Sequence, residues 1–196
     1  MRRSSAAILF AASAFGSIAS AVAAPPHAAL LPQESRIGFI TQQMGVPVEG
    51  QFRKFDAQIA LDPKRPDGGS VAMQIDTGSA TLGAAQADAE LPTAAWFDTV
   101  RHPRASFQSE SIRQLGGGKL EVVGTLTIKG RARPLVVPVT IAPGDGAKSV
   151  ASGSFTVQRL EFRIGEGEWS DISMVADAVQ VRFRLTFTGL AGMAAP

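Results

Sequence analysis

Apolar and polar side chains alternate along most of the chain after its first 34 residues, and this period of two is typical of β-strands that bury one face. The most regular run is residues 179–188, where every odd position is apolar and every even position is polar. Residues 119–129 alternate nearly as well, and Gly116-Gly117-Gly118 predicts a turn that joins them to residues 104–112 as a hairpin. The whole pattern predicts about eight strands, at residues 35–43, 48–61, 70–77, 104–112, 119–129, 133–142, 149–159 and 177–188.

Two segments interrupt the alternation. Residues 78–98 contain a helical pattern at residues 84–91, which ends at Pro92 because proline removes a backbone donor. Residues 165–176 follow neither period and are rich in glycine and acidic side chains. The chain therefore carries one short predicted helix, between the third and fourth predicted strands.

The predicted strands each have an apolar face that must be covered. Short turns join most of them, so neighbours pair antiparallel. One short helix is too small to cover an open sheet of this size, so the sheet folds into two layers or closes on itself. Closure also removes exposed edges. We predict an all-β fold, a closed eight-stranded antiparallel β-barrel, with a two-layer sandwich as the alternative. An outer-membrane barrel is disfavoured because the chain has no Tyr and few aromatic side chains for interface girdles.

The first 24 residues have the pattern of an export signal. Arg2 and Arg3 precede a short apolar stretch, and small residues around Ala23 and Ala24 form a cleavage site. We expect cleavage there and a periplasmic location. A retained membrane anchor is the alternative, but the apolar stretch is short for a bilayer. The predicted domain organisation is a signal peptide at residues 1–24, a flexible segment at residues 25–33 and the barrel at residues 34–190.

Charge and cysteine content narrow the function classes. Without Arg2 and Arg3 the 19 basic side chains become 17, equal to the 17 acidic ones, so the exported chain is formally neutral. No long basic run is present, and we therefore expect no nucleic-acid partner. The absence of cysteine excludes disulfides, thiolate nucleophiles and Cys-ligated metals.

Four marks, in this order along the chain, resemble those of one known family. They are Ser35-Arg36-Ile37-Gly38-Phe39 with Gly45-Val46-Pro47-Val48-Glu49-Gly50-Gln51-Phe52; Trp96-Phe97-Asp98 with Pro103-Arg104-Ala105-Ser106-Phe107; Gly124-Thr125-Leu126-Thr127-Ile128-Lys129-Gly130; and Arg159-Leu160-Glu161-Phe162-Arg163-Ile164-Gly165. Together they resemble the YceI-like family of bacterial periplasmic proteins, over about residues 34–188.

The resemblance implies a lipocalin-like barrel with a long central tunnel. It also implies that the tunnel binds a polyisoprenoid or similar long-chain amphiphile, with a role in the metabolism, transport or storage of isoprenoid quinones. No catalytic reaction and no cofactor other than such a lipid is implied. Some relatives occur with cytochrome b561-type membrane proteins. The alternative is therefore a solidly packed interaction module for a membrane redox partner; an enzyme that acts on a bound lipid is a weaker one.

Inward-facing apolar side chains are the candidates for ligand contact, because burial of apolar area contributes about 25 cal/mol per Å2. Ordinary core packing is the alternative role for each of them. The candidates are Phe39, Phe52, Ile59, Met73, Ile75, Trp96, Phe97, Phe107, Leu126, Ile128, Val137, Phe155, Phe162, Val181, Phe183 and Leu185.

Three side chains in or near the irregular segments are candidates for other roles. Trp96 and Trp169 are predicted to form a lid or a plug at the barrel mouth. Arg159 could meet a ligand head group, because a guanidinium fork suits phosphate or quinone oxygens. Its alternative role is an ion pair with Asp98 or Asp171.

Catalytic and metal sites have little support in the sequence. The two histidines are His102, beside a proline, and His27, near the start of the exported chain. They offer neither a metal triad nor a Ser-His-Asp arrangement. We therefore predict a binding protein with no catalytic residues and no metal.

Overall fold

The computed structural model describes residues 27–62 and 65–189, which form one sheet of eleven strands and one short α-helix. The predicted signal peptide at residues 1–24 lies outside these residues. The helix is α1 (Ala85–Glu90). The strands are β1 (His27–Leu30), β2 (Arg36–Gln43), β3 (Val46–Phe52), β4 (Phe55–Asp62), β5 (Arg65–Asp76), β6 (Ala80–Thr81), β7 (Arg104–Gly116), β8 (Lys119–Ile128), β9 (Arg131–Pro143), β10 (Lys148–Gln158) and β11 (Ala178–Thr188).

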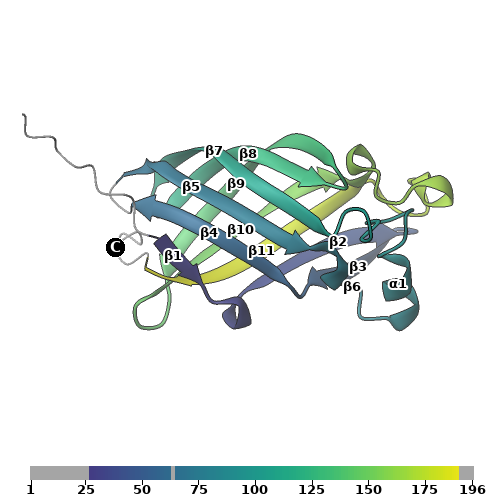
Figure 1. The fold of residues 1–196 in the computed structure, drawn as a ribbon, viewed down its shortest axis with the longest axis horizontal. Coiled ribbons are helices and arrows are strands. Elements are labelled where there is room, and N and C mark those ends of the chain that lie inside the picture. Colours follow the sequence, from purple (N-terminus) through teal and green to yellow (C-terminus); the bar gives the residue numbers. More distant parts are fainter. Residues whose placement is uncertain (1–26, 63–64, 190–196) are drawn as a thin grey trace, which may run out of the picture.

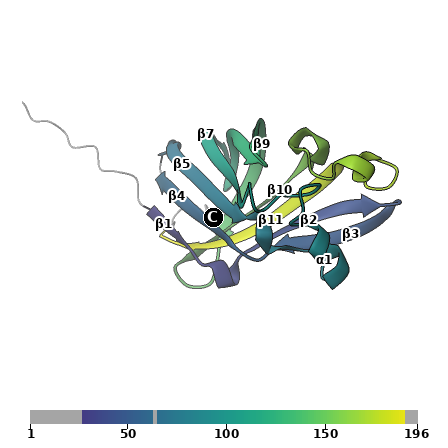
Figure 2. The same ribbon diagram turned by 45° about the vertical axis from the view of Figure 1, so that its right-hand side comes forward.

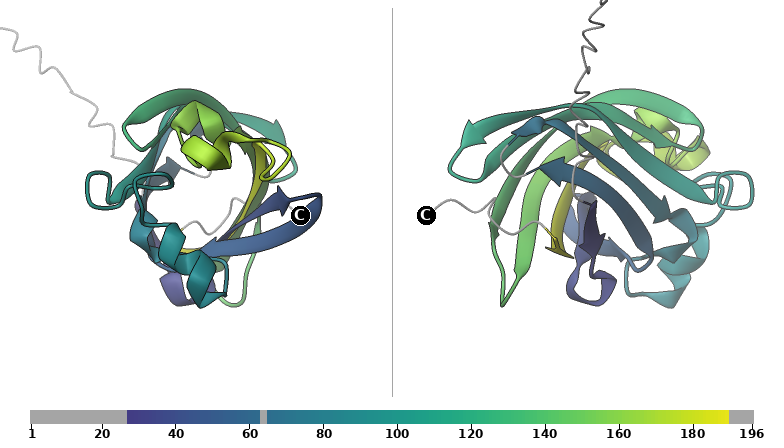
Figure 3. Two further views of the ribbon diagram at one scale, coloured as in Figure 1. Left: turned by 90° about the vertical axis from the view of Figure 1, so that its right-hand side faces the viewer. Right: turned by 60° about the vertical axis from the view of Figure 1, so that its left-hand side comes forward.

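Eight of these strands form a closed ring (Figures 1 and 3). They follow the order β1-β4-β5-β7-β8-β9-β10-β11, and β11 pairs again with β1. Every pairing around the ring is antiparallel. The predicted all-β, eight-stranded closed barrel is therefore confirmed, and the sandwich is excluded. Closure accounts for the alternating pattern, because the apolar inner faces of the strands bury one another inside the ring.

The other three strands extend the sheet at one end of the ring. β11 shares one edge between two partners: Phe187 and Thr188 pair with β1, whereas residues 180–184 pair with β2. β2 then pairs with β3, and β3 with β6. Figure 2 shows the β2–β3 hairpin projecting from the barrel, with α1 beside it.

The predicted strand at residues 48–61 is two strands, which corrects the prediction. The ladder breaks at Arg53 and Lys54, whose backbone N–H groups donate to the backbone and side-chain oxygens of Ser79 at 3.2 and 3.0 Å. The break sends β3 to β2 and β6, and β4 to β1 and β5. The apolar positions change parity here, from Phe52 to Phe55, which is the sequence signal for the break.

The barrel also begins earlier than predicted. His27–Leu30, within the segment predicted to be flexible, forms β1 and closes the ring. Ala28 is buried opposite Ile59, so even this short strand contributes to the core. β5 likewise starts at Arg65, earlier than the predicted strand at residues 70–77.

The predicted helix at residues 84–91 is confirmed as α1, one residue shorter at each end. It is held to the sheet by Asp88, which accepts from Thr81 Oγ1 at 2.6 Å and from the Leu82 amide at 2.5 Å. Across residues 27–62 and 65–189, no helix has the length and apolar character needed to span a bilayer.

Candidate ligand-binding site

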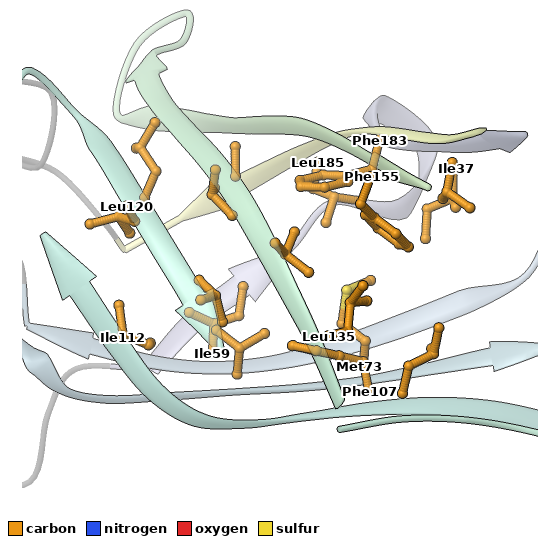
Figure 4. A pocket seen from close by; sticks show the side chains of 18 of the residues that line it. Ile37, Ile59, Met73, Phe107, Ile112, Leu120, Leu135, Phe155, Phe183 and Leu185 are labelled. Carbon is orange, nitrogen blue, oxygen red and sulfur yellow. The ribbon is translucent and has the colours of Figure 1, made fainter. Parts of the chain in front are cut away.

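The barrel encloses an apolar cavity of about 120 Å3, and side chains from the ring and from β2 point into it (Figure 4). No lining residue carries a polar side chain, so the wall offers carbon and the sulfur of Met73 only. The lining residues are Ile37, Ile59, Leu61, Val71, Met73, Ile75, Phe107, Ile112, Leu120, Val122, Leu126, Leu135, Val137, Val139, Ile141, Ala151, Phe155, Val181, Phe183, Leu185 and Phe187.

The strand register brings these side chains together. Phe107 on β7 lies opposite Met73 on one side and Leu126 on the other. Phe155 on β10 lies opposite Val181. Because side chains alternate along a strand, each such pair places two apolar groups on the inner face, and the pairs follow one another around the ring. The cavity wall is thus a direct product of the alternating sequence.

Ten of the sixteen predicted ligand-contact residues line this cavity. They are Ile59, Met73, Ile75, Phe107, Leu126, Val137, Phe155, Val181, Phe183 and Leu185. The sequence prediction missed eleven further lining residues, although all lie on inward-facing positions of the strands. They are Ile37, Leu61, Val71, Ile112, Leu120, Val122, Leu135, Val139, Ile141, Ala151 and Phe187. Parity within each strand points to most of these residues. Ile112 is an exception: it differs in parity from Phe107 on the same strand, because the β7–β8 ladder shifts register between Ser109 and Ser111.

The remaining six candidates lie outside the cavity wall, at the end of the barrel near α1. Phe52, Trp96, Phe97, Ile128 and Phe162 belong to a second apolar cluster, in which Phe97 and Phe162 are buried. Phe39 packs against Phe52, with ring centroids 5.4 Å apart. Phe52 and Phe97 meet edge to face at 5.8 Å. These side chains gather at one end of the barrel. Strand parity predicts which face a side chain is on but not its position along the barrel, so it could not separate Phe39, Phe52 and Ile128 from the lining residues.

The two tryptophans meet at this same end. Trp96 and Trp169 have ring centroids 5.7 Å apart at an interplanar angle of 49°. Trp96 packs on the second apolar cluster, and its buried Nε1 has no hydrogen-bond partner among the described residues. The pair therefore forms a small aromatic cover over the cluster.

Arg159 has a structural environment that differs from the predicted one. Its side chain is 2% exposed, and all five of its N–H groups donate to backbone carbonyls. The acceptors are Ala176, Ile164, Gly165, Trp169 and Val175, at 2.6–3.0 Å. Burial lowers the pKa of Arg159, and the charge of Asp177 opposes that effect. In this arrangement the guanidinium has no N–H left for a ligand head group, and it pairs with neither Asp98 nor Asp171.

Arg159 instead fixes the irregular segment around Trp169. The carbonyls that it binds come from the start, middle and end of residues 164–176, a stretch without a regular ladder. A buried donor set of this kind satisfies carbonyls that would otherwise be unpaired. Sequence reasoning missed this role because it depends on loop carbonyls that only the fold brings together.

Metal ligands do not gather in the part of the chain that the structure describes. Across residues 27–62 and 65–189, no three His, Asp or Glu side chains are placed to hold a metal ion. The only chemistry of the enclosed cavity wall is apolar contact.

Comparison with known proteins places this barrel in a family. Protein YceI of Escherichia coli O157:H7 is 31% identical over 147 residues, covering 74% of this chain and 76% of that protein. The crystal structure of Burkholderia cenocepacia BcnA matches with a TM-score of 0.77 and 41% identity, over 80% of this chain and 98% of BcnA.

A more distant structure shares the fold. A polyisoprenoid binding domain from Saccharophagus degradans, implicated in plant cell wall breakdown, has a TM-score of 0.67 at 13% identity, over 83% of this chain and 98% of that domain. The YceI-like domain model matches residues 29–187, which include almost all of the barrel. This chain therefore belongs to the YceI-like domain family.

Proposed function

We propose that this protein binds a polyisoprenoid or another long-chain amphiphilic lipid inside the barrel, as a carrier or store, and that it does so by binding rather than by catalysis. One observation carries the proposal: the enclosed cavity is lined by twenty-one residues without a polar side chain. Each ligand methylene that leaves water for such a wall contributes about 0.8 kcal/mol. An apolar chain is the ligand class that gains most from such a wall.

The volume of the cavity limits the length of chain that it can hold. An apolar cavity of about 150 Å3 accepts benzene, so the 120 Å3 present here suits a segment of about five carbon atoms. A longer chain needs further volume. Met73 is a partly buried, flexible side chain on the wall, and its rotation toward the strands would lengthen the cavity along the barrel.

Two further features support this proposal. The polyisoprenoid binding domain of Saccharophagus degradans has the same fold, which makes an isoprenoid chain the leading ligand. The export pattern of residues 1–24 supports a periplasmic location, where a quinone-type isoprenoid would need a covered apolar site between membranes. A role in isoprenoid-quinone metabolism is consistent with both.

Lipid extraction tests the proposal directly. The protein is purified without detergent, its organic extract is analysed by mass spectrometry, and a long-chain lipid is expected in the extract. Ala151→Leu fills part of the cavity with apolar atoms and should lower the amount recovered. Ala142→Leu is the matched control, since Ala142 is an exposed residue on the neighbouring strand β9. An empty wild-type extract, or equal recovery from both variants, would overturn the proposal.

A second candidate function is an interaction module for a membrane b-type cytochrome. The observation that favours it is an exposed apolar patch made of Met44 and Val46 on the β2–β3 turn with Ile172 and Met174 on the facing loop. The Met44 amide donates to the Met174 carbonyl at 2.9 Å, so the patch is held together by backbone contacts. Exposed apolar patches often mark protein or membrane contacts.

Copurification tests this second function. A b561-type cytochrome in detergent should be retained by the wild-type protein and lost with Met44→Ser/Ile172→Ser. The control is Val136→Ser, which changes an exposed apolar side chain on β9. Retention by all three proteins, or by none, would exclude the patch as a cytochrome contact.

A further inference from the structure

An arginine-lined hollow lies on the outer face of the sheet, where β11, β2 and β3 run side by side. It has a volume of about 420 Å3, and four arginines line it: Arg36, Arg53, Arg182 and Arg184. We infer that this arginine hollow binds a phosphate group. Arg36, Arg182 and Arg184 alternate along their strands with Ile37, Phe183 and Leu185, which line the barrel cavity, so these arginines point to the outer face. Arg53 lies just after the end of β3, and Phe183 borders both the hollow and the cavity.

The strand register builds the hollow around a glycine. Gly38 on β2 lies between Arg182 on β11 and Gln51 on β3. It has no side chain, and a Cβ at this position would meet only the Gly50 carbonyl oxygen, at 3.3 Å. The space above Gly38 is therefore free. It is bordered by Arg36 on β2 itself, by Arg182 and Arg184 on β11, and by Arg53 just after β3.

Two of the arginines lie opposite each other, and no negative charge is paired with either of them in the described part of the chain. Arg36 and Arg184 are direct cross-strand partners, and both are exposed. Within residues 27–62 and 65–189, neither side chain has a hydrogen-bonded or ion-paired partner. Like charges placed directly opposite each other destabilise a sheet. An anion bound between the two guanidinium groups would offset that repulsion, so an anion site accounts for their adjacent positions.

The other two arginines are held by neutral groups. Arg182 donates from Nε and one terminal nitrogen to Gln180 Oε1, at 3.0 and 2.7 Å. Arg53 lies 3.4 Å from Thr81 Oγ1. Glu49 is the one carboxylate among the described residues that line the hollow. Four positive charges against one negative charge leave a strong excess at a concave surface, which favours an anion.

A second carboxylate lies beside the hollow without lining it. Asp88 lies next to the hollow, bound to Thr81. Its pKa is lowered mainly by the hydrogen bond from Thr81, then by the Leu82 amide, with a further contribution from the charge of Arg53. Asp88 is therefore held mainly by Thr81 and Leu82, and it is not one of the residues that line the hollow.

A second cationic pocket, of about 530 Å3 near the β8–β9 turn, is neutralised to a greater extent. Its Lys129 binds Glu166 at 3.0 Å, and its Arg101 binds Asp98 at 2.5 Å. The arginine hollow has no ion pair of this kind in the described part of the chain. Its guanidinium forks match the oxygens of a phosphate group, which accepts several such donors at once.

Two sources could supply that phosphate group: a phospholipid head group at a membrane surface, or a soluble phosphate compound. Titration calorimetry at low salt with inorganic phosphate and with pyrophosphate tests the second source. Sedimentation with phosphatidylcholine vesicles, with and without phosphatidylglycerol, tests the first. Binding in either arm should weaken as NaCl is added, because the charges are exposed.

Three variants locate the binding. Arg36→Gln/Arg184→Gln should weaken binding at least roughly tenfold, since it removes charge-assisted hydrogen bonds. Gly38→Leu keeps every charge but fills the hollow, and it should weaken binding to a similar degree. Arg65→Gln/Arg113→Gln removes two exposed arginines elsewhere, each paired with a carboxylate, and should leave binding within about twofold of wild type.

Thermal unfolding provides an independent check of the same charges. Without phosphate, Arg36→Gln/Arg184→Gln should unfold at a higher temperature than wild type, because cross-strand repulsion is gone. With phosphate, wild type should gain more than the variant. Binding in either arm that falls with both hollow variants supports the inference and identifies the source. No binding in both arms, or equal loss in the Arg65→Gln/Arg113→Gln control, would overturn it.

Discussion

The ring of Phe183 on β11 covers Gly153, its direct cross-strand partner on β10. A Cβ at residue 153 would lie 2.6 Å from Phe183 Cζ and would also collide with the Pro138 carbonyl oxygen. Phe39 covers its direct partner Gly50 in the same way, and Phe107 covers Gly124, which lies diagonally across the β7–β8 ladder. Glycine on the inner face thus gives three large rings a place against the barrel wall, which keeps them out of its centre.

Gly153→Ala is therefore expected to destabilise the protein by roughly 1–3 kcal/mol, as overpacking of a closely packed interior does. The added methyl has no space, because one of its neighbours is a backbone oxygen that side-chain rotation cannot move. Urea unfolding measures the change. Gly68→Ala is the control, since a Cβ there would meet nothing closer than 3.9 Å. If Gly153→Ala unfolded at the same urea concentration as Gly68→Ala, the close Phe183–Gly153 contact would be contradicted.

A charge on the inner face should have a different effect from the same charge outside. Val137 and Val136 are neighbours on β9, with exposed fractions of 7% and 51%. Val137→Asp places a carboxylate in the apolar cavity and should unfold the barrel or abolish lipid uptake. Val136→Asp should change the free energy of unfolding by less than about 0.5 kcal/mol. Circular dichroism and lipid extraction compare the two, and similar behaviour would refute the assignment of inner and outer faces.

Arg159→Lys should destabilise the fold by roughly 3 kcal/mol or more, because an ammonium has three donors and several buried carbonyls would lose their partner. The loss concerns the loop around Trp169, which Arg159 holds through five backbone acceptors. Arg163→Lys is the control, at an exposed arginine nearby. Urea unfolding separates the two variants. If Arg159→Lys were as stable as its control, the buried donor network would have no energetic role.

Asp88 should make stability depend on pH in the acid range. Its pKa is lowered in the folded protein, first by the Thr81 hydroxyl and then by the Leu82 amide. Its contribution is therefore fully present above the unfolded value of about 4 and is lost as pH falls through the lower folded value. Asp88→Asn should flatten the decline of the urea midpoint below that pH, whereas Asp67→Asn, at an exposed position on β5, should not. Parallel acid profiles for wild type and Asp88→Asn would contradict this role.

The tryptophan pair should report on the mouth of the barrel. Trp96 and Trp169 are the only two tryptophans of the chain, so intrinsic fluorescence comes from this pair alone. If a lipid enters past them, its uptake changes the emission, and Trp169→Ala should accelerate exchange of a prenylated probe several-fold because the cover loses one of its two rings. Stopped-flow fluorescence with Trp96 as the remaining reporter measures the rate. Unchanged exchange would place the entry route at the opposite end.

Most of the barrel follows from parity in the sequence. Residues 179–188 alternate without error, and β11 is the strand that pairs with β10, β1 and β2. The cavity wall follows in the same way, since inward positions are the odd ones along β11. Alternation predicts which side chains of a strand point to the interior, and this is the property that a strand of a closed barrel requires.

Other features could not be read from alternation. β1 has four residues, too few for a period to be distinguished, and its position depends on partners far along the chain. Phe97 and Phe162 resemble lining residues in sequence, but they lie in irregular segments and pack at the barrel end. Arg159 has its partners in a loop, whose carbonyl directions no periodicity encodes.

The divided edge of β11 has a consequence for how this family can vary. Since residues 187–188 bond to β1 and residues 180–184 bond to β2, the seam that completes the ring and the seam that carries the projecting hairpin are separate ladders on one strand. Lengthening or trimming the hairpin would reshape that end of the barrel while the seam at β1 stays intact. The shape of this end and the closure of the ring thus depend on different hydrogen bonds, and selection could alter the first without endangering the second.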